Sequence, residues 1–310
     1  MHLLNMIRKV LRRLLFIVSV SVICFSCTTD TSDGLTCYGV LGDFQAYGNS
    51  VRFAHVRIPV RIMGPDYSLE GMLYYKPGLT RYRGIVTTHG RIGRQPQRNA
   101  NEVFGYRNLN SYLASNGAMV LFVVRSGYGQ SDGDSDSEFL ETPAQSGMAA
   151  AKDLAAGIRY LQFIDSVEKG NMIIVGHSQG GWAALCAAGF RLEDVSLVVN
   201  ISGGTNYRAM RSGNVTAQVQ EDWIRSCFEL GEKSTVPSMW FYSENDQSHP
   251  QSYVRRMAES YADGGGRVKL IILPPYGDNR HEIVKIPNCF AILSYPFNNS
   301  YRLKIKTKDR

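Results

Sequence analysis

Apolar and polar positions along the chain predict strands and helices in regular alternation. Short apolar runs typical of buried strands are separated by longer stretches in which apolar residues recur at helical spacing. The predicted strands cover Gly84–Thr88, Met119–Val124, Met172–Val175, Val195–Ile201, Ser238–Tyr242 and Val268–Leu273. The predicted helices cover Asn108–Asn116, Pro143–Ile164, Gln179–Phe190, Thr216–Leu230 and Gln251–Ala262, with a last one starting near His281. Repeated β–α units of this length predict an α/β fold, a mostly parallel sheet with helices on both faces.

Two segments depart from this alternation. Val51–Met63 and Leu69–Tyr75 alternate apolar and polar residues around Gly64-Pro65-Asp66, which predicts an antiparallel hairpin. Residues 203–237 interrupt the series, and we expect there either a small cap over the site or an ordinary connecting helix. We therefore predict one domain over residues 51–310, preceded by a linker and N-terminal extension at 27–50.

Residues 1–26 have the three parts of a secretory signal peptide. A basic region ends at Arg13, the apolar run Leu14–Phe25 follows, and small residues lie around Ser26. This mostly apolar run of 12 residues is too short to span a bilayer comfortably, so we expect export rather than a membrane-spanning helix. The junction at Cys27 resembles a bacterial lipoprotein cleavage site. Both alternatives stay open: a periplasmic or outer-membrane lipoprotein anchored at Cys27, and a soluble periplasmic or secreted form.

Composition and charge narrow the class of partner. The chain has 310 residues and is 44% hydrophobic, which is ample for a buried core. Its formal net charge of +7 falls to +3 without the four lysine and arginine residues of segment 1–26, too little to indicate nucleic-acid binding. Beyond Cys27, the cysteines are Cys37, Cys186, Cys227 and Cys289, which could form two disulfides in three ways in an oxidising compartment. We expect Cys186 to be a small buried core residue.

The stretch Asn171–Phe190 carries the clearest chemical signal. Its pattern predicts a buried strand, then the turn Gly176-His177-Ser178-Gln179-Gly180, and then an alanine-rich helix. A serine on so sharp a turn sits in strained backbone with its hydroxyl clear of the sheet, which is typical of a nucleophile. Gly129–Gly133 matches the same G-x-S-x-G pattern, but a polar acidic loop follows it. We therefore interpret Ser178 as the nucleophile and Ser131 as a loop residue.

A serine hydroxyl becomes reactive when a base takes its proton and a third group orients that base. His281 follows the last predicted strand and is the candidate base, with His249 as a reserve that we expect on the surface. Asp246 ends the loop after the preceding strand and is the candidate acid, with Glu244 and Asp278 as alternatives. The order Ser, Asp, His along the chain favours this choice.

The oxyanion that forms on the substrate requires two hydrogen-bond donors. One is expected to be the backbone N–H of Gln179, directly after the nucleophile. The other is expected from the loop His89-Gly90-Arg91-Ile92-Gly93, at the N–H of Arg91.

Together these motifs resemble the α/β-hydrolase superfamily, and within it the dienelactone hydrolase-like and serine esterase branch. The residues that carry the resemblance are His89-Gly90, Arg125-Ser126-Gly127-Tyr128-Gly129, Gly176-His177-Ser178-Gln179-Gly180-Gly181, Asp246 and His281. The resemblance implies an eight-stranded, mostly parallel sheet and ester hydrolysis through an acyl-enzyme, without metal or organic cofactor. Dienelactone hydrolases proper use cysteine as the nucleophile, so the serine at position 178 argues against dienelactone hydrolase activity.

The leading hypothesis is an exported serine hydrolase that cleaves a small-molecule or glycan-linked carboxylic ester. A serine peptidase is the first alternative because such peptidases share this scaffold. A non-catalytic binding lipoprotein is the second, and the complete set of three candidate residues argues against it.

Overall fold

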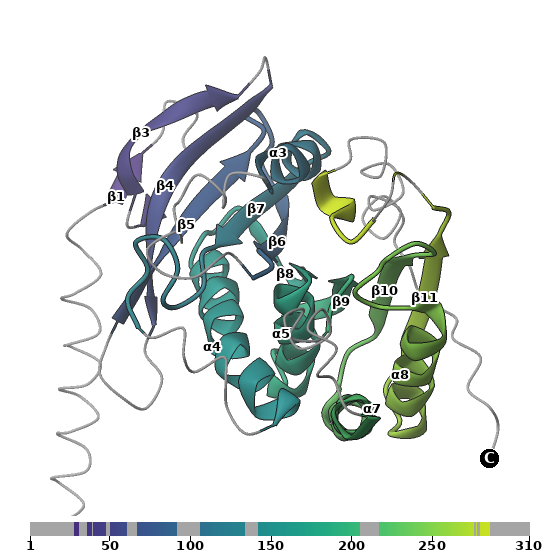
Figure 1. Ribbon diagram of the computed structural model, residues 1–310. Helices are drawn as coiled ribbons and strands as arrows, with labels where there is room; N and C mark the ends of the chain where they lie inside the picture. The colour runs from purple at the N-terminus through teal and green to yellow at the C-terminus, as the bar shows by residue number, and fades with distance from the viewer. Residues whose placement is uncertain are drawn as a thin grey trace, which may run out of the picture.

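The computed structural model describes residues 28–30, 36–38, 40–47, 50–60, 67–91, 106–133, 142–204, 217–275, 277 and 280–285 (Figure 1). Segment 1–26 and Cys27, where the sequence predicts a signal peptide and its junction, lie outside these residues. Within the described ranges, none of the helices combines the length and the apolar content that crossing a bilayer requires.

A nine-stranded sheet runs through the molecule in the order β11-β10-β9-β8-β6-β7-β5-β4-β3 (Figure 1). The strands are β3 (Val40–Tyr47), β4 (Val51–Val60), β5 (Tyr67–Tyr75), β6 (Tyr82–Thr88), β7 (Ala118–Val123), β8 (Val167–His177), β9 (Val195–Ile201), β10 (Ser238–Ser243) and β11 (Val268–Leu273). Neighbouring strands from β11 to β7 pair in parallel, whereas β7, β5, β4 and β3 pair antiparallel. The predicted mostly parallel sheet and the antiparallel hairpin are therefore confirmed.

The sheet has one strand more than the eight that we expected. The additional strand, β3, lies in residues 27–50, which we interpreted as a linker and extension. Its register with β4 shifts between Leu41 and Gln45, so the strand lacks the regular alternation by which strands are recognised. The same stretch contains a second, two-stranded antiparallel sheet of β1 (Thr28–Asp30) and β2 (Thr36–Tyr38).

Helices cover both faces of the large sheet, as predicted. They are α3 (Arg107–Ser115), α4 (Pro143–Gln162), α5 (Gln179–Ala187), α7 (Ala217–Lys233) and α8 (Gln251–Asp263), with short 3-10 helices η3 (Ala188–Phe190) and η4 (Ile283–Lys285). Successive strand residues point to opposite faces: Ile173 packs in the cluster with α3 and η4, and Ile174 in the cluster with α4, α5, α7 and α8. Near His281, where we expected a helix to begin, the structure has the short η4, and residues after 285 lie outside the described part.

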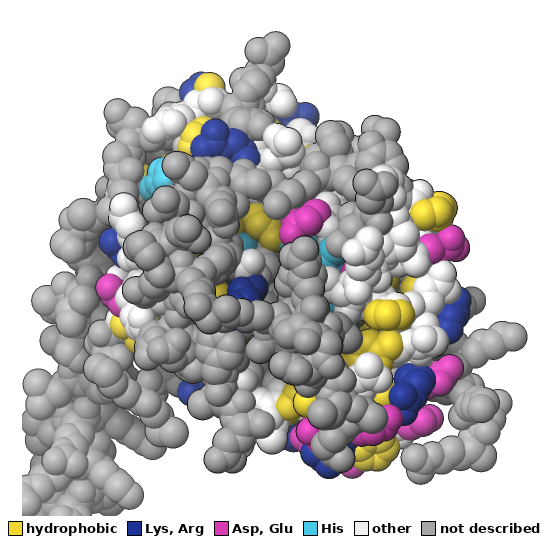
Figure 2. Space-filling view, viewed as in Figure 1, with side chains coloured by type: hydrophobic (Ala, Val, Ile, Leu, Met, Phe, Trp, Pro, Cys, Tyr) yellow, Lys and Arg dark blue, Asp and Glu magenta, His cyan; other side chains and the backbone are white. Residues whose placement is uncertain are grey.

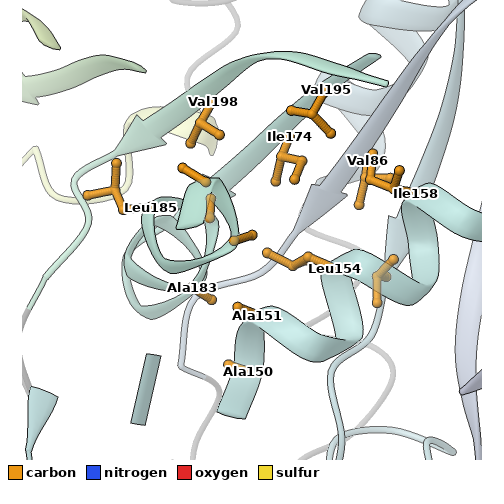
Figure 3. Packing of buried hydrophobic residues seen from close by; sticks show 14 of the residues in the cluster. Val86, Ala150, Ala151, Leu154, Ile158, Ile174, Ala183, Leu185, Val195 and Val198 are labelled. Atoms are coloured by element: carbon orange, nitrogen blue, oxygen red, sulfur yellow. The ribbon is translucent and has the colours of Figure 1, made fainter. Parts of the chain in front are cut away.

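The interface between the sheet and α4 explains how closely the layers approach. Alanines of α4 and α5 pack with larger aliphatic side chains of the strands (Figure 3). Gly157 of α4 faces β7, and a Cβ there would lie 2.8 Å from Val123 Cγ2. The helix begins with a capping box between Thr142 and Gln145, whose side chains each accept the other's backbone N–H. Local capping and a small-residue face thus fix α4 against the sheet.

The stretch interpreted as a cap or a connecting helix contains α7, which packs beside α4 and α8. Trp223 of α7 is buried with its ring centroid 4.5 Å from that of Trp182 on α5. On the solvent side, Arg256 of α8 forms an ion pair with Glu221 of α7, 2.7 Å apart. On the face shown in Figure 2, the described basic and acidic side chains intermingle over this region. The helix α7 therefore belongs to the layer that covers the sheet.

Candidate active site

Ser178 lies at a sharp turn between β8 and α5. Its backbone has φ 53° and ψ −122°, a conformation that a non-glycine residue rarely adopts. A Cβ on Gly176 would overlap the carbonyl oxygen of Gly180, and one on Gly180 would overlap the carbonyl oxygen of His89. The two glycines of the motif are therefore required by close backbone approach, and they leave the Ser178 side chain partly exposed at the end of the strand.

The structure brings Ser178, Asp246 and His281 together at the carboxyl edge of the sheet. His281 Nε2 lies 3.0 Å from Ser178 Oγ. On the other side of the ring, His281 Nδ1 lies 3.1 Å from Asp246 Oδ2 and 3.2 Å from Oδ1. Because an ionised carboxylate only accepts, Nδ1 carries the proton and Nε2 is left to accept from the serine hydroxyl.

The environment of Asp246 keeps it ionised. Burial by itself raises its pKa, but hydrogen bonds from His249 and His281 outweigh burial and hold the pKa of Asp246 well below its usual value. The carboxylate Oδ1 also accepts the backbone N–H groups of Ser248 at 2.8 Å and His249 at 3.1 Å. These donors fix the orientation of the carboxylate that faces His281.

The expectation that His249 is a surface residue is wrong. Its side chain is 1% exposed, with Nδ1 3.5 Å from Asp246 Oδ2. Its ring stacks on that of His281 at a centroid distance of 5.4 Å and an interplanar angle of 23°. The ring is enclosed because Tyr242 packs edge-on at 5.8 Å and a Cβ on Gly204 would lie 2.7 Å from His249 Nε2. Burial lowers the pKa of His249 despite the neighbouring carboxylate, so the ring is neutral at neutral pH.

Of the alternatives for the acid, Glu244 is exposed and Asp278 lies outside the described residues. Asp246, His249 and His281 also form a group whose metal-binding atoms lie within 4.8 Å of one another. Those same atoms are engaged with each other, since both histidine Nδ1 atoms face the Asp246 carboxylate. The geometry thus corresponds to a histidine base held by a carboxylate.

The loop after β6 passes directly beside Ser178. A Cβ on Gly90 would lie 3.0 Å from Ser178 Cβ, so only a glycine fits comfortably at this point. His89 is fully buried, and its ring spans the loop: Nδ1 donates to the Gly90 carbonyl at 2.6 Å and Nε2 accepts the Arg125 N–H at 3.1 Å. Arg91 follows, partly buried, so the loop from which we expect an oxyanion donor borders the serine.

Arg125 also belongs to the site, although no pattern in the sequence indicated a role for its side chain. Its side chain is 1% exposed, and its guanidinium donates to the carbonyl oxygens of His89 and Gly90. It also lies 3.4 Å from Gln179 Oε1 and 5.4 Å from the ring centroid of Tyr128. The position of Arg125 in the Arg-Ser-Gly-Tyr-Gly motif was visible in the sequence, but its burial between two loops was not.

The second G-x-S-x-G match serves a structural purpose. Ser131 Oγ accepts the Glu70 backbone N–H at 2.8 Å and donates to the Val124 carbonyl at 2.6 Å. Asp132 likewise accepts from the backbone and hydroxyl of Ser68. The loop is fastened to β5, and the interpretation of Ser131 as a loop residue is confirmed.

Cys186 and Cys227 are both buried and form no disulfide. Burial raises the pKa of each thiol, so both stay protonated. The expectation that Cys186 is a core residue is confirmed, and the two cysteines fill apolar space between α5 and α7.

Comparison with known proteins identifies the fold. No family model matches the sequence, and no curated protein matches it. Among solved structures, Est1E from Butyrivibrio proteoclasticus, with ferulic acid bound, aligns with TM-score 0.53 and 17% identity over 76% of this chain and 98% of its own. An acetyl xylan esterase from a Paenibacillus species aligns with TM-score 0.50 and 16% identity over 76% and 82%. The acylaminoacyl peptidase of Pyrococcus horikoshii aligns with TM-score 0.58 and 14% identity over 84% of this chain and 43% of its own. The chain has the α/β-hydrolase fold.

Proposed function

We propose that this protein is a serine hydrolase that cleaves a carboxylic ester through an acyl-enzyme intermediate. The observation that supports this most directly is the continuous chain of Ser178 Oγ, His281 and Asp246, with distances of 3.0 and 3.1 Å. The strained turn that presents Ser178, and the His281 ring whose Nε2 faces it, are what an activated nucleophile needs.

In the first step, Ser178 Oγ attacks the acyl carbon while His281 Nε2 takes its proton. The charge that develops on the carbonyl oxygen is stabilised by the backbone N–H groups of Gln179 and Arg91. Collapse of the tetrahedral intermediate breaks the ester bond, and the leaving alcohol takes the proton from His281. Water then attacks the acyl group with His281 again as base, which releases the acid and restores the serine. Asp246 stays ionised throughout and stabilises the imidazolium.

The substrate class that we propose is a small-molecule or glycan-linked ester, handled without metal or organic cofactor. One solved structure with this fold is named as an acetyl xylan esterase, and another has ferulic acid bound. The peptidase is the second candidate, because one neighbour of the same fold is an acylaminoacyl peptidase. Comparing hydrolysis of matched aminoacyl amides and esters separates the two, and we expect turnover of the esters only.

The test of the serine assignment uses the chain's own duplicate motif as a control. Ser178→Ala is expected to abolish turnover of a short-acyl nitrophenyl ester and labelling by a fluorophosphonate probe. Ser131→Ala changes the equivalent serine of the other G-x-S-x-G sequence and is expected to retain turnover and labelling. Equal activity of Ser178→Ala and the wild type would refute the proposal. Absence of labelling in the folded wild type would instead favour the non-catalytic binding protein.

We also propose that the protein is exported and anchored to a membrane through a lipid on Cys27, with a soluble exported form as the alternative. Expression in a bacterium fed a labelled fatty acid tests this, because Cys27→Ala is expected to abolish labelling and release the protein from the membrane fraction. Equal labelling of wild type and variant would argue against the anchor.

A further inference from the structure

A chain of hydrogen bonds runs beneath the candidate site and does not involve Ser178 or Asp246. The Gly90 N–H donates to Tyr106 Oη at 2.8 Å, and Tyr106 Oη lies 2.7 Å from His177 Nδ1. On the far side of that ring, His177 Nε2 lies 3.0 Å from the carbonyl oxygen of His281. All of these contacts are buried.

With a neutral His177 ring, the chemistry of the groups fixes the direction of every bond in this chain. The His281 carbonyl can only accept, so His177 carries its proton on Nε2 and donates. In the neutral ring, His177 Nδ1 is then an acceptor. The Tyr106 hydroxyl donates to it and uses a lone pair for the Gly90 N–H. Burial raises the pKa of Tyr106, which keeps this hydroxyl protonated.

These hydrogen bonds connect three segments whose relative positions matter for the proposed reaction. Gly90 belongs to the loop beside the nucleophile, His177 immediately precedes the nucleophile, and His281 supplies the base. The Gly90 N–H donates to Tyr106 Oη, so this bond holds the loop in which Arg91, the expected oxyanion donor, follows Gly90. The Tyr106 ring is itself fixed by stacking on Phe122 at a centroid distance of 5.4 Å.

We propose that Tyr106 is a positioning residue that aligns the oxyanion loop and the main chain of His281 with Ser178. This inference rests on the proposed function, since it assigns a further residue to the same reaction. Tyr106 does not contact Ser178 Oγ in the hydrogen-bond network and acts through Gly90 and His177. Its loss should therefore affect transition-state stabilisation more than substrate binding.

The test compares Tyr106→Phe with Tyr74→Phe. Both substitutions remove one hydroxyl from a buried tyrosine of the same hydrophobic cluster, but the Tyr74 hydroxyl donates to Met72 Sδ at 3.6 Å and not to His177. For Tyr106→Phe we expect kcat on the nitrophenyl ester to fall by about 10- to 100-fold, with KM changed by less than about threefold. Phosphonylation by the fluorophosphonate probe should slow in proportion, whereas Tyr74→Phe should match the wild type in both assays.

A second variant covers the case in which Tyr106→Phe does not fold. His177→Asn places an amide oxygen near the position of Nδ1, which can still accept from Tyr106, but its side chain is too short to reach the His281 carbonyl. We expect kcat to fall for this variant too. If Ser178→Ala is inactive but the folded Tyr106→Phe matches Tyr74→Phe in kcat, the positioning role is overturned and the proposed function stands. Wild-type kcat in His177→Asn would likewise overturn it, whereas activity in Ser178→Ala would remove the proposed function itself.

Discussion

Replacing Asp246 by asparagine tests whether the carboxylate sets the proton position on His281. The substitution keeps the size of the side chain and changes one oxygen to an amide nitrogen. The backbone donors of Ser248 and His249 both point at Oδ1, so the amide oxygen must stay there. The amide nitrogen then replaces Oδ2, 3.1 Å from His281 Nδ1, where it donates instead of accepting. The amide oxygen, 3.2 Å from Nδ1, already accepts both backbone N–H groups.

This exchange has a large consequence for His281. With a donor facing Nδ1, the neutral ring carries its proton on Nε2, which points at Ser178 Oγ and can no longer take the serine proton. The negative charge that stabilises the imidazolium is lost as well. An asparagine in the equivalent position of a serine triad lowers kcat by about 10⁴-fold, which corresponds to roughly 5 kcal/mol of activation free energy.

The measurement is kcat for a short-acyl nitrophenyl ester at neutral pH, with circular dichroism to confirm folding. Glu244→Gln is the matched control because it makes the same carboxylate-to-amide change two residues earlier, on an exposed side chain. We expect Glu244→Gln to retain wild-type kcat. If the folded Asp246→Asn variant lost less than about tenfold in kcat while Ser178→Ala was inactive, the assigned role of Asp246 would be wrong.

Three further changes probe the same region. Burial lowers the pKa of His249, so the stability that this neutral ring contributes is complete above its unfolded pKa of about 6.5 and is lost as pH falls through the folded pKa. When the pH is lowered from about 7.5 to about 5, the melting temperature of His249→Phe should therefore fall less than that of the wild type. Equal falls in the two proteins would contradict this prediction. Gly176→Ala places a Cβ against the Gly180 carbonyl and should cost roughly 3 kcal/mol or more in urea unfolding; a loss under about 1 kcal/mol would show that the turn can relax. Gly90→Ala places a Cβ 3.0 Å from Ser178 Cβ, so we expect a large fall in kcat and only a small fall in melting temperature. An unchanged kcat would contradict the close approach of this loop to Ser178.

Local patterns in the sequence determined the alternating elements and the order of the chemical residues. β9 and β11 have the predicted bounds, because a short run of apolar residues between polar loops has few alternatives to a buried strand. The turn around Ser178 was equally readable, since strand, glycine-flanked serine and small-residue helix are consecutive in the chain. Parallel strands then bring the loops that follow them to one edge of the sheet, and Asp246 and His281 lie in two of those loops.

Tertiary structure alone decided the features that depend on partners distant in sequence. β3 is a strand because it pairs with the edge of β4. A register shift in this pair removes the apolar and polar alternation by which the strand could be predicted from sequence. His249 follows an aspartate loop and precedes a proline, a context typical of the surface, yet His281 and Tyr242 enclose its ring. Tyr106 gains its two hydrogen bonds from residues 16 and 71 positions away. Burial and hydrogen-bond direction arise when separate segments fold against one another, and no local pattern of residues carries that information.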